Sequence, residues 1–99
     1  MIQIDYHDAT LVQSKLLWKE GAGELEFRLC TRESTIAVIR FEGLIEFNCP
    51  RRFPWGKSVS VNEIREDEKK GCLEIEMQSG DVIRIHAAAW TEVTPSTRG

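Results

Sequence analysis

The chain has 99 residues, of which 41% are hydrophobic and 29% are charged, and its formal net charge is -3 at pH 7. This length suits one domain with a modest core, and the hydrophobic share excludes wholesale disorder. The acidic balance argues against nucleic acid as the main partner, and no apolar run approaches the roughly 18 residues of a membrane span.

The first eleven residues have neither the basic start nor the long apolar stretch of a signal peptide. The cysteines Cys30, Cys49 and Cys72 are odd in number and widely spaced, which favours reduced thiols in a cytoplasm over a disulfide framework. No Cys-x-x-Cys or Cys/His pair has the spacing of a metal site. We therefore expect a cytoplasmic protein with neither metal nor cofactor.

Residues 2–5 suggest a short edge strand or a frayed start, and the polar residues 6–10 suggest a turn or one helical turn. Residues 11–18 and 24–31 are predicted strands on either side of a glycine-containing turn. A four-residue loop would pair Trp18 with Leu25 and Leu16 with Phe27, with Leu25 and Phe27 facing inward.

The next predicted strand, residues 35–41, has apolar side chains on both faces, which is typical of a central strand. Gly43 then predicts a bulge or a sharp bend before a strand at residues 44–49, in which Ile45 and Phe47 face inward. Polar and apolar residues alternate again at residues 58–61. Ile64 does not fit this alternation, which predicts a bulge near Asn62. Residues 65–71 are expected to form a charged turn.

The sequence from Cys72 to Ala88 predicts a β-hairpin, because apolar and polar residues alternate on both sides of a Ser-Gly-Asp turn. The expected core residues are Leu73, Ile75, Met77, Ile83, Ile85 and Ala87. A three-residue loop at 79–81 predicts the pairs Met77–Ile83, Ile75–Ile85, Glu76–Arg84 and Glu74–His86. A two-residue turn with a nearby bulge would preserve the same faces. Residues 88–90 extend the strand or form a helical turn.

Seven short runs separated by turn residues, with no helical periodicity, are typical of an all-β domain. We expect about seven antiparallel strands in a meander that forms a small sandwich or a partly open barrel. One domain would cover residues 1–90, and residues 91–99 would be a loose tail.

Catalytic and metal interpretations find little support in the sequence. His7 and Asp8 are adjacent, but two neighbouring side chains supply neither the ligand number nor the geometry of a metal site, and the other histidine, His86, is expected on the outer face of a strand. We expect Asp8 to cap a turn and His7 to form local hydrogen bonds. Nucleophile and phosphate-loop motifs are absent from the sequence, so an enzyme is not predicted.

The loop at residues 50–56 is the predicted partner-binding site, with Arg51, Arg52, Phe53 and Trp55 as its residues. Arginine and aromatic side chains are enriched at the centres of protein interfaces. In the alternative, Phe53 and Trp55 fold down over the end of the sheet and the arginines stay solvated. The acidic rows of residues 24 and 26 and residues 74 and 76 could meet a basic partner or simply form the solvated face of a sheet.

Five stretches together resemble a group of small uncharacterised bacterial proteins. They are Tyr6–Leu11, the strand that ends at Trp18, Phe41-x-Gly43, Pro54-Trp55-Gly56 and Leu73–Gly80. That group is similar in turn to some immunity proteins of polymorphic-toxin systems. The resemblance implies a cytoplasmic β-rich domain without known catalysis, and an immunity role would require a cognate toxin.

Two functions follow as hypotheses. The first is a non-catalytic protein-interaction module, immunity-like or otherwise, that binds through a sheet face or the loop at 50–56. The second is a small-ligand or carbohydrate-binding β domain in which Trp18, Trp55 or Trp90 stacks on the ligand. A homodimer could also form through an unpaired edge at Val59–Val61.

Overall fold

A computed structural model describes residues 2–30, 35–52 and 59–94. Six strands form one antiparallel sheet in the order β1-β2-β3-β6-β5-β4. Their bounds are β1 Thr10–Leu17, β2 Ala22–Arg28, β3 Ile36–Asn48, β4 Val61–Asp67, β5 Cys72–Met77 and β6 Val82–Val93. No α-helix occurs in these residues, so the all-β prediction is confirmed.

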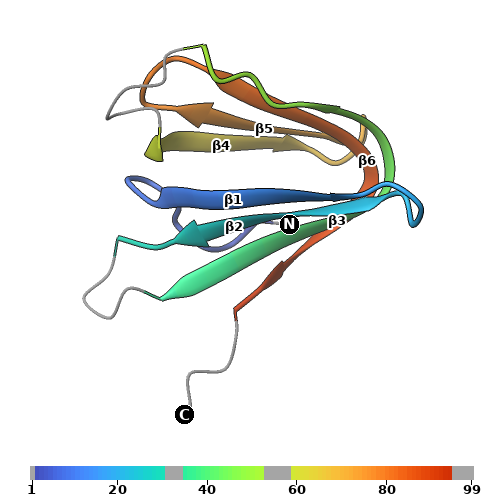
Figure 1. Cartoon of the computed structure of the whole chain (residues 1–99), viewed down its shortest axis with the longest axis horizontal. Coiled ribbons are helices and arrows are strands. Elements are labelled where there is room, and N and C mark those ends of the chain that lie inside the picture. The colour runs from blue at the N-terminus through green and yellow to red at the C-terminus, as the bar shows by residue number, and fades with distance from the viewer. Residues whose placement is uncertain (1, 31–34, 53–58, 95–99) are drawn as a thin grey trace.

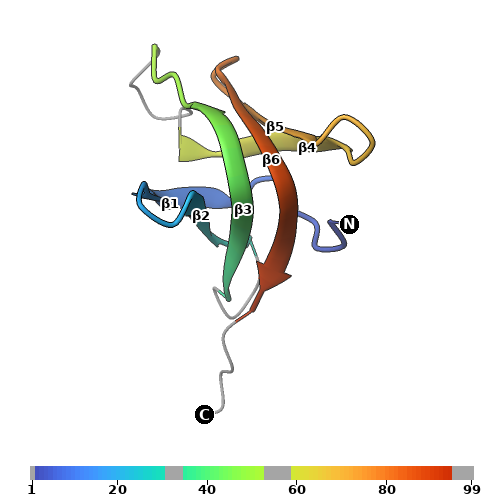
Figure 2. The same ribbon diagram turned by 90° about the vertical axis from the view of Figure 1, so that its right-hand side faces the viewer.

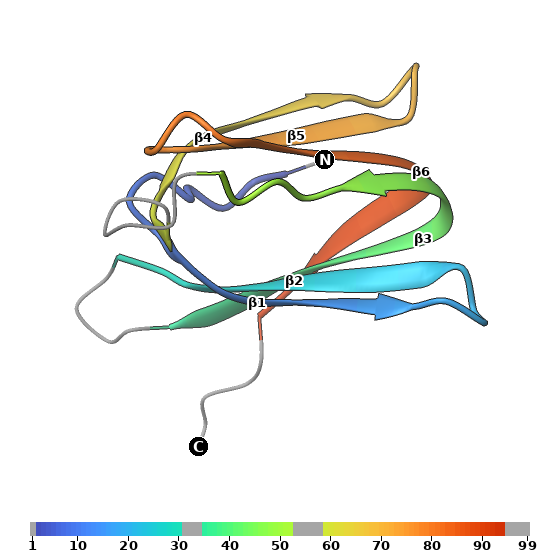
Figure 3. The ribbon, with the colours of Figure 1, turned by 45° about the horizontal axis from the view of Figure 1, so that its top comes forward.

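The sheet consists of two three-stranded meanders joined at their centre, and not of the single meander predicted. β3 pairs with β6 and not with β4, the next strand in the sequence. The chain therefore passes from β3, in the middle of the sheet, to β4, which forms the edge farthest from β1. β3 and β6 are long and strongly curved (Figure 2). Their curvature brings β4 and β5 over β1 and β2 as two layers (Figures 1 and 3). The buried apolar side chains of these strands form one cluster.

The predicted strands 35–41 and 44–49 are one continuous strand, which is why six strands occur where seven were expected. Gly43 adopts a φ of 63°, a left-handed conformation that favours glycine, and the β3–β6 register shifts between Leu44 and Glu46. The bulge predicted at this glycine is thus confirmed. The irregularity turns Ile45 outward, 69% exposed and contrary to prediction, whereas Phe47 packs against the ring of Phe41.

Alternation along the strands correctly predicted which side chains form the core. The buried apolar residues of β2, β3, β5 and β6 include Leu25, Phe27, Ala37, Ile39, Phe41, Leu73, Ile75, Met77, Ile83, Ile85 and Ala87. Because successive side chains of a strand point to opposite faces, each strand contributes every second residue to the same core. β3 is central, as its apolar residues on both faces indicated.

The register of the β5–β6 hairpin differs by two residues from the predicted one. Ile75 lies opposite Ile83, and Glu74 opposite Arg84. The loop has three residues, as predicted, but these are 78–80, because Gly80 adopts a φ of 100° in its third position. The predicted pairs Met77–Ile83, Ile75–Ile85, Glu76–Arg84 and Glu74–His86 are therefore wrong. Moving a loop by one residue shifts the register by two, which leaves the inward face unchanged.

The β1–β2 hairpin has a four-residue loop, but at residues 18–21, because Leu17 pairs with Ala22. The predicted pairs of Trp18 with Leu25 and Leu16 with Phe27 are therefore wrong. Trp18 lies in the turn and is 85% exposed, and Leu16 is 44% exposed opposite Gly23. β1 is thus an edge strand with exposed apolar residues.

β4 is longer than predicted, because residues 65–67, expected in a turn, are its last three residues. The bulge expected near Asn62 is confirmed by a register shift between Val61 and Glu63. Arg65 lies on the outer face and donates to Glu63 at 2.7 Å, Glu76 at 2.9 Å and Glu74 at 3.4 Å. The hydrogen bond from Arg65 lowers the pKa of the Glu76 carboxyl group.

The predicted free edge at Val59–Val61 is already partly paired. Val61 exchanges backbone hydrogen bonds with Asp8 and Ala9, and Ser60 accepts one from Gln78. A single antiparallel bridge joins Thr10 to Ser60. The backbone N–H and C=O of Val61 and the carbonyl of Ser60 are therefore already bonded within the protein.

The N-terminal segment is not a strand but is fixed to the sheet by two carboxylates. Glu92 accepts from Gln3 N at 2.7 Å, Ile4 N at 3.0 Å and Tyr6 Oη at 2.9 Å. Glu66 accepts from Ile2 N at 2.7 Å. Glu92 belongs to β6, which continues to Val93, so the first three residues of the predicted tail are part of the sheet. Residues 95–99 of that tail lie outside the described residues.

Alkaline pH should destabilise the protein through Tyr6. Burial raises the pKa of its phenol above the usual value of about 10, and the hydrogen bond to Glu92 and its charge raise it further. The unfolded chain therefore loses this proton first, so the stability is fully present below about pH 10 and falls as the pH rises above it. Tyr6 is the one tyrosine, so tyrosinate absorbance of the native protein reports this group alone.

Urea unfolding of the wild type and Tyr6→Phe between neutral and alkaline pH would check this effect. We expect Tyr6→Phe to be less stable near pH 7 by about 1 kcal/mol, for the lost hydrogen bond, but less sensitive to alkali. The prediction would be contradicted if the free energy of unfolding fell equally steeply with pH above about pH 10 in the two proteins. It would also be contradicted if Tyr6 in the folded protein titrated with the ordinary pKa of a tyrosine.

Candidate functional site

A groove of about 270 Å³ lies beside β1, between that strand and the segment that follows β3. Its lining is mostly apolar or uncharged, and consists of Leu11, Val12, Gln13, Ser14, Cys49, Pro50, Arg51, Val59, Met77, Asp81 and Ile83. Val12 is 42% exposed and Val59 is 44% exposed. The groove therefore offers partly solvated apolar surface next to a guanidinium group.

Arg51 and Arg52, two of the four predicted partner-binding residues, are exposed at this groove or directly after it. The backbone N–H of Arg52 donates to the Asp81 carboxylate at 3.0 Å, and Asp81 is buried in the turn between β5 and β6. This bond fixes the arginine segment to the sheet. Phe53 and Trp55 lie outside the described residues.

Cys49 lies in the groove, and its side chain is exposed to solvent on one side. Burial of the thiol, and then the charge of Asp81, raise the pKa of Cys49 above its ordinary value. The thiolate is the reactive form of cysteine, so a raised pKa makes this thiol less reactive near neutral pH.

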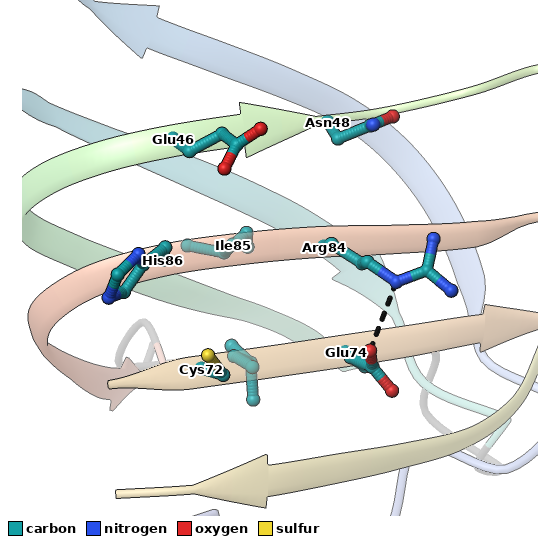
Figure 4. Close-up of a pocket in the computed structure, with 8 residues that line it drawn as sticks. Glu46, Asn48, Cys72, Glu74, Arg84, Ile85 and His86 are labelled. Atoms are coloured by element: carbon teal, nitrogen blue, oxygen red, sulfur yellow. Dashed lines mark hydrogen bonds and ion pairs between the residues drawn. The ribbon is translucent and has the colours of Figure 1, made fainter. Parts of the chain in front are cut away.

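A second, smaller pocket of about 160 Å³ lies on the outer face of β3, β6 and β5 (Figure 4). Cross-strand pairing places Glu46, His86 and Cys72 in one row. Sequence reasoning missed this row, because only the register of three strands from distant parts of the chain aligns it. The thiol of Cys72 contacts the carbonyl of Lys70 at 3.6 Å, and the pocket also holds the ion pair between Arg84 and Glu74 at 3.0 Å.

This row does not form a metal site. Within the described ranges, no group of three or more His, Cys, Asp or Glu side chains is arranged to hold a metal ion. The cysteines in these ranges form no disulfide, which agrees with the expectation of free thiols.

His7 and Asp8 occupy a turn whose backbone reaches a φ of 65° at Asp8. The Nδ1 atom of His7 lies 2.9 Å from the Asn62 carbonyl oxygen, and its backbone N–H donates to Asp5. Asp8 accepts a hydrogen bond from the Gln78 amide. The hydrogen bond to Asn62 and the charge of Asp8 raise the pKa of His7. The hydrogen-bond partners of the two side chains, Asn62 and Gln78, are far away in the sequence, so the prediction of local hydrogen bonds for His7 and of a turn cap by Asp8 is not confirmed.

The two tryptophans that the structure describes, Trp18 and Trp90, do not line the groove. Trp18 is in the β1–β2 turn, and Trp90 is buried on β6 with its indole N–H donating to Glu66 at 3.0 Å. Trp55 lies outside the described residues. An aromatic surface for stacking on a sugar ring is therefore not found in the groove as far as the structure describes it.

Comparisons of the chain with protein-family models, with curated proteins and with solved structures found no match. The part of the chain that the structure describes contains no helix with the length and apolar character needed to cross a membrane. Function must therefore be inferred from the groove and its surroundings.

Proposed function

We propose that the protein is a non-catalytic interaction module that binds another protein at the groove beside β1, with an immunity-like blocking role as the specific form. The observation that carries this proposal is the combination, at one place, of exposed apolar side chains with two exposed arginines. Such combinations are typical of interface centres. The anchoring of Arg52 to Asp81 supports a preformed surface.

We also propose that the curled sheet is a partly open barrel. The edge strands β1 and β4 belong to opposite ends of the strand order, yet a bridge joins Thr10 of β1 to Ser60, the residue directly before β4. The groove then lies where the edges diverge. Three thiols without disulfides support a bacterial cytoplasm as the location.

A small-ligand or carbohydrate-binding role is the alternative. The volume of the groove, about 270 Å³, is just below the range of roughly 300–1,000 Å³ that is usual for small-molecule sites. Its lining mixes apolar side chains with the guanidinium group of Arg51, which is typical of protein interfaces, so protein binding is the function that we prefer.

Charge reversal at the groove should abolish partner binding. The immobilised protein would be exposed to an extract of the source bacterium, and recovered proteins would be compared between wild type and the Arg51→Glu, Arg52→Glu variant. We expect a partner whose affinity, measured by titration after purification, falls at least about tenfold in that variant.

The matched control is Lys69→Glu, Lys70→Glu, which makes the same change of charge in the exposed turn between β4 and β5. This turn follows the last residue of β4, whereas Val59 of the groove precedes its first. The control should bind like the wild type. If both variants recover the partner equally well, the groove is not the contact surface.

A further inference from the structure

The arginines at the groove beside β1 differ from those on the faces of the sheet in their ion pairs. Arg40, Arg65 and Arg84 each bind a glutamate of a neighbouring strand. Arg51 and Arg52 are exposed, and within residues 2–30, 35–52 and 59–94 no ion pair reaches either guanidinium group. These two positive charges are therefore open to the carboxylate of another molecule.

The backbone on both sides of Arg51 is restricted. Pro50 precedes it, and the ring of a proline holds φ near about −65°. The N–H of Arg52, which follows it, donates to the carboxylate of Asp81 at 3.0 Å. Asp81 is the one carboxylate of the groove lining and is only 5% exposed. Arg51 thus lines the groove from a segment with little freedom to lose, which lowers the entropic cost of binding.

Apolar surface lies beside this positive charge. Val12 and Val59, both about half-exposed, line the same groove as Arg51. A volume of about 270 Å³ suits an anchoring side chain of a partner better than a whole small molecule. A guanidinium group binds a carboxylate through two parallel hydrogen bonds, and an apolar side chain removes the valines from water. The groove is therefore complementary to a carboxylate that lies next to an apolar side chain.

We infer that the partner presents to this groove an extended peptide segment in which an aspartate or glutamate lies within about two residues of a leucine, isoleucine or phenylalanine. This inference rests on the proposed function and adds the chemistry of its partner. The net charge of -3 works against a polyanion such as nucleic acid at long range, whereas a single carboxylate meets the two arginines locally.

Selection from a displayed library of random linear peptides tests the inference without a known partner. The immobilised wild type should enrich peptides that carry aspartate or glutamate beside an apolar residue. Arg51→Glu, Arg52→Glu should lose these peptides and enrich lysine or arginine beside the same kind of apolar residue. Enrichment by the charge-reversed variant also shows that it has kept its groove.

A synthetic peptide from the wild-type selection then gives affinities by fluorescence anisotropy. We expect Arg51→Glu, Arg52→Glu to weaken its binding about tenfold or more. Replacing the carboxylates of the peptide with amides should weaken it about fivefold. Arg51→Lys keeps the charge but not the paired donors, and should weaken it about threefold. The matched control Lys69→Glu, Lys70→Glu should bind like the wild type.

The inference is overturned if the wild type enriches no peptide, if its peptides lack acidic residues, or if both proteins enrich the same peptides. The extract experiment separates this failure from that of the proposed function. A partner lost by Arg51→Glu, Arg52→Glu, with no acidic peptide enriched, would leave the groove as a binding surface for other chemistry. If neither experiment depends on the two arginines, both proposals fail.

Discussion

Replacing Glu92 with alanine is expected to lower the free energy of unfolding by about 3 kcal/mol, which is a large share of the stability of a small domain. The carboxylate accepts hydrogen bonds from the backbone of Gln3 and Ile4 and from the buried phenol of Tyr6. Its loss leaves three donors without their acceptor, and the N-terminal segment must detach or stay in place unsatisfied. Urea unfolding followed by tryptophan fluorescence measures the change.

Two further variants separate this effect from a general loss of charge. Glu63→Ala removes an exposed carboxylate of β4 that binds Arg65, and should change stability by less than about 0.5 kcal/mol. Glu92→Gln keeps an acceptor oxygen and should lose less stability than Glu92→Ala. In amide spectra of Glu92→Ala, residues 2–6 should lose their native shifts. Equal stabilities for Glu92→Ala and Glu63→Ala would show that the segment is not held by this carboxylate.

The side chains that face inward could be predicted from the sequence, because the face of a residue depends only on whether its position along the strand is odd or even. Ile75 and Ile85 remain in the core whichever of two registers forms, since a shift by two residues preserves the face. The register itself depends on turn geometry. Gly80 must occupy the left-handed third position of its loop, and this requirement, not the match of Glu76 with Arg84, selects the pairing.

The position of a strand within the sheet is harder to predict from alternation. Residues 11–18 looked like a strand with an inward Trp18, but β1 is an edge strand and Trp18 lies in an exposed turn, and the alternation along this stretch does not show where the strand ends or which strands lie beside it. The contacts that close Val59–Val61 come from Asp8 and Ala9, far away in the chain. Local sequence could not show them.

The candidate site was predicted in part. Arg51 was named from the arginine and aromatic content of its loop, and it does line the groove. The other wall, from Leu11 to Ser14, could not be predicted, because it comes from a strand that is far away in the sequence from Cys49 to Arg51 and lies beside them only in the folded protein. Composition can therefore indicate one binding residue, but long-range topology determines its neighbours.

Replacing Gly23 with alanine should destabilise the protein by about 2–3 kcal/mol, although alanine fits an ordinary strand conformation better than glycine does. A Cβ atom at this position would lie 2.5 Å from Cε2 of Phe41 and 2.9 Å from the Lys15 carbonyl oxygen. Phe41 is fully buried and lies opposite Gly23 across β2 and β3, so its ring covers the glycine in place of a side chain. The ring would have to move within a close-packed core.

A double-mutant cycle measured by urea unfolding tests whether the collision with the Phe41 ring causes the loss of stability in Gly23→Ala. Phe41→Ala alone should cost about 3–5 kcal/mol through the cavity that it leaves. In that background Gly23→Ala should cost at least about 1 kcal/mol less than in the wild type, because the ring it collides with is gone. The contact with the Lys15 carbonyl oxygen stays in both backgrounds, so some cost should remain. Strictly additive losses would mean that Phe41 does not require glycine at position 23.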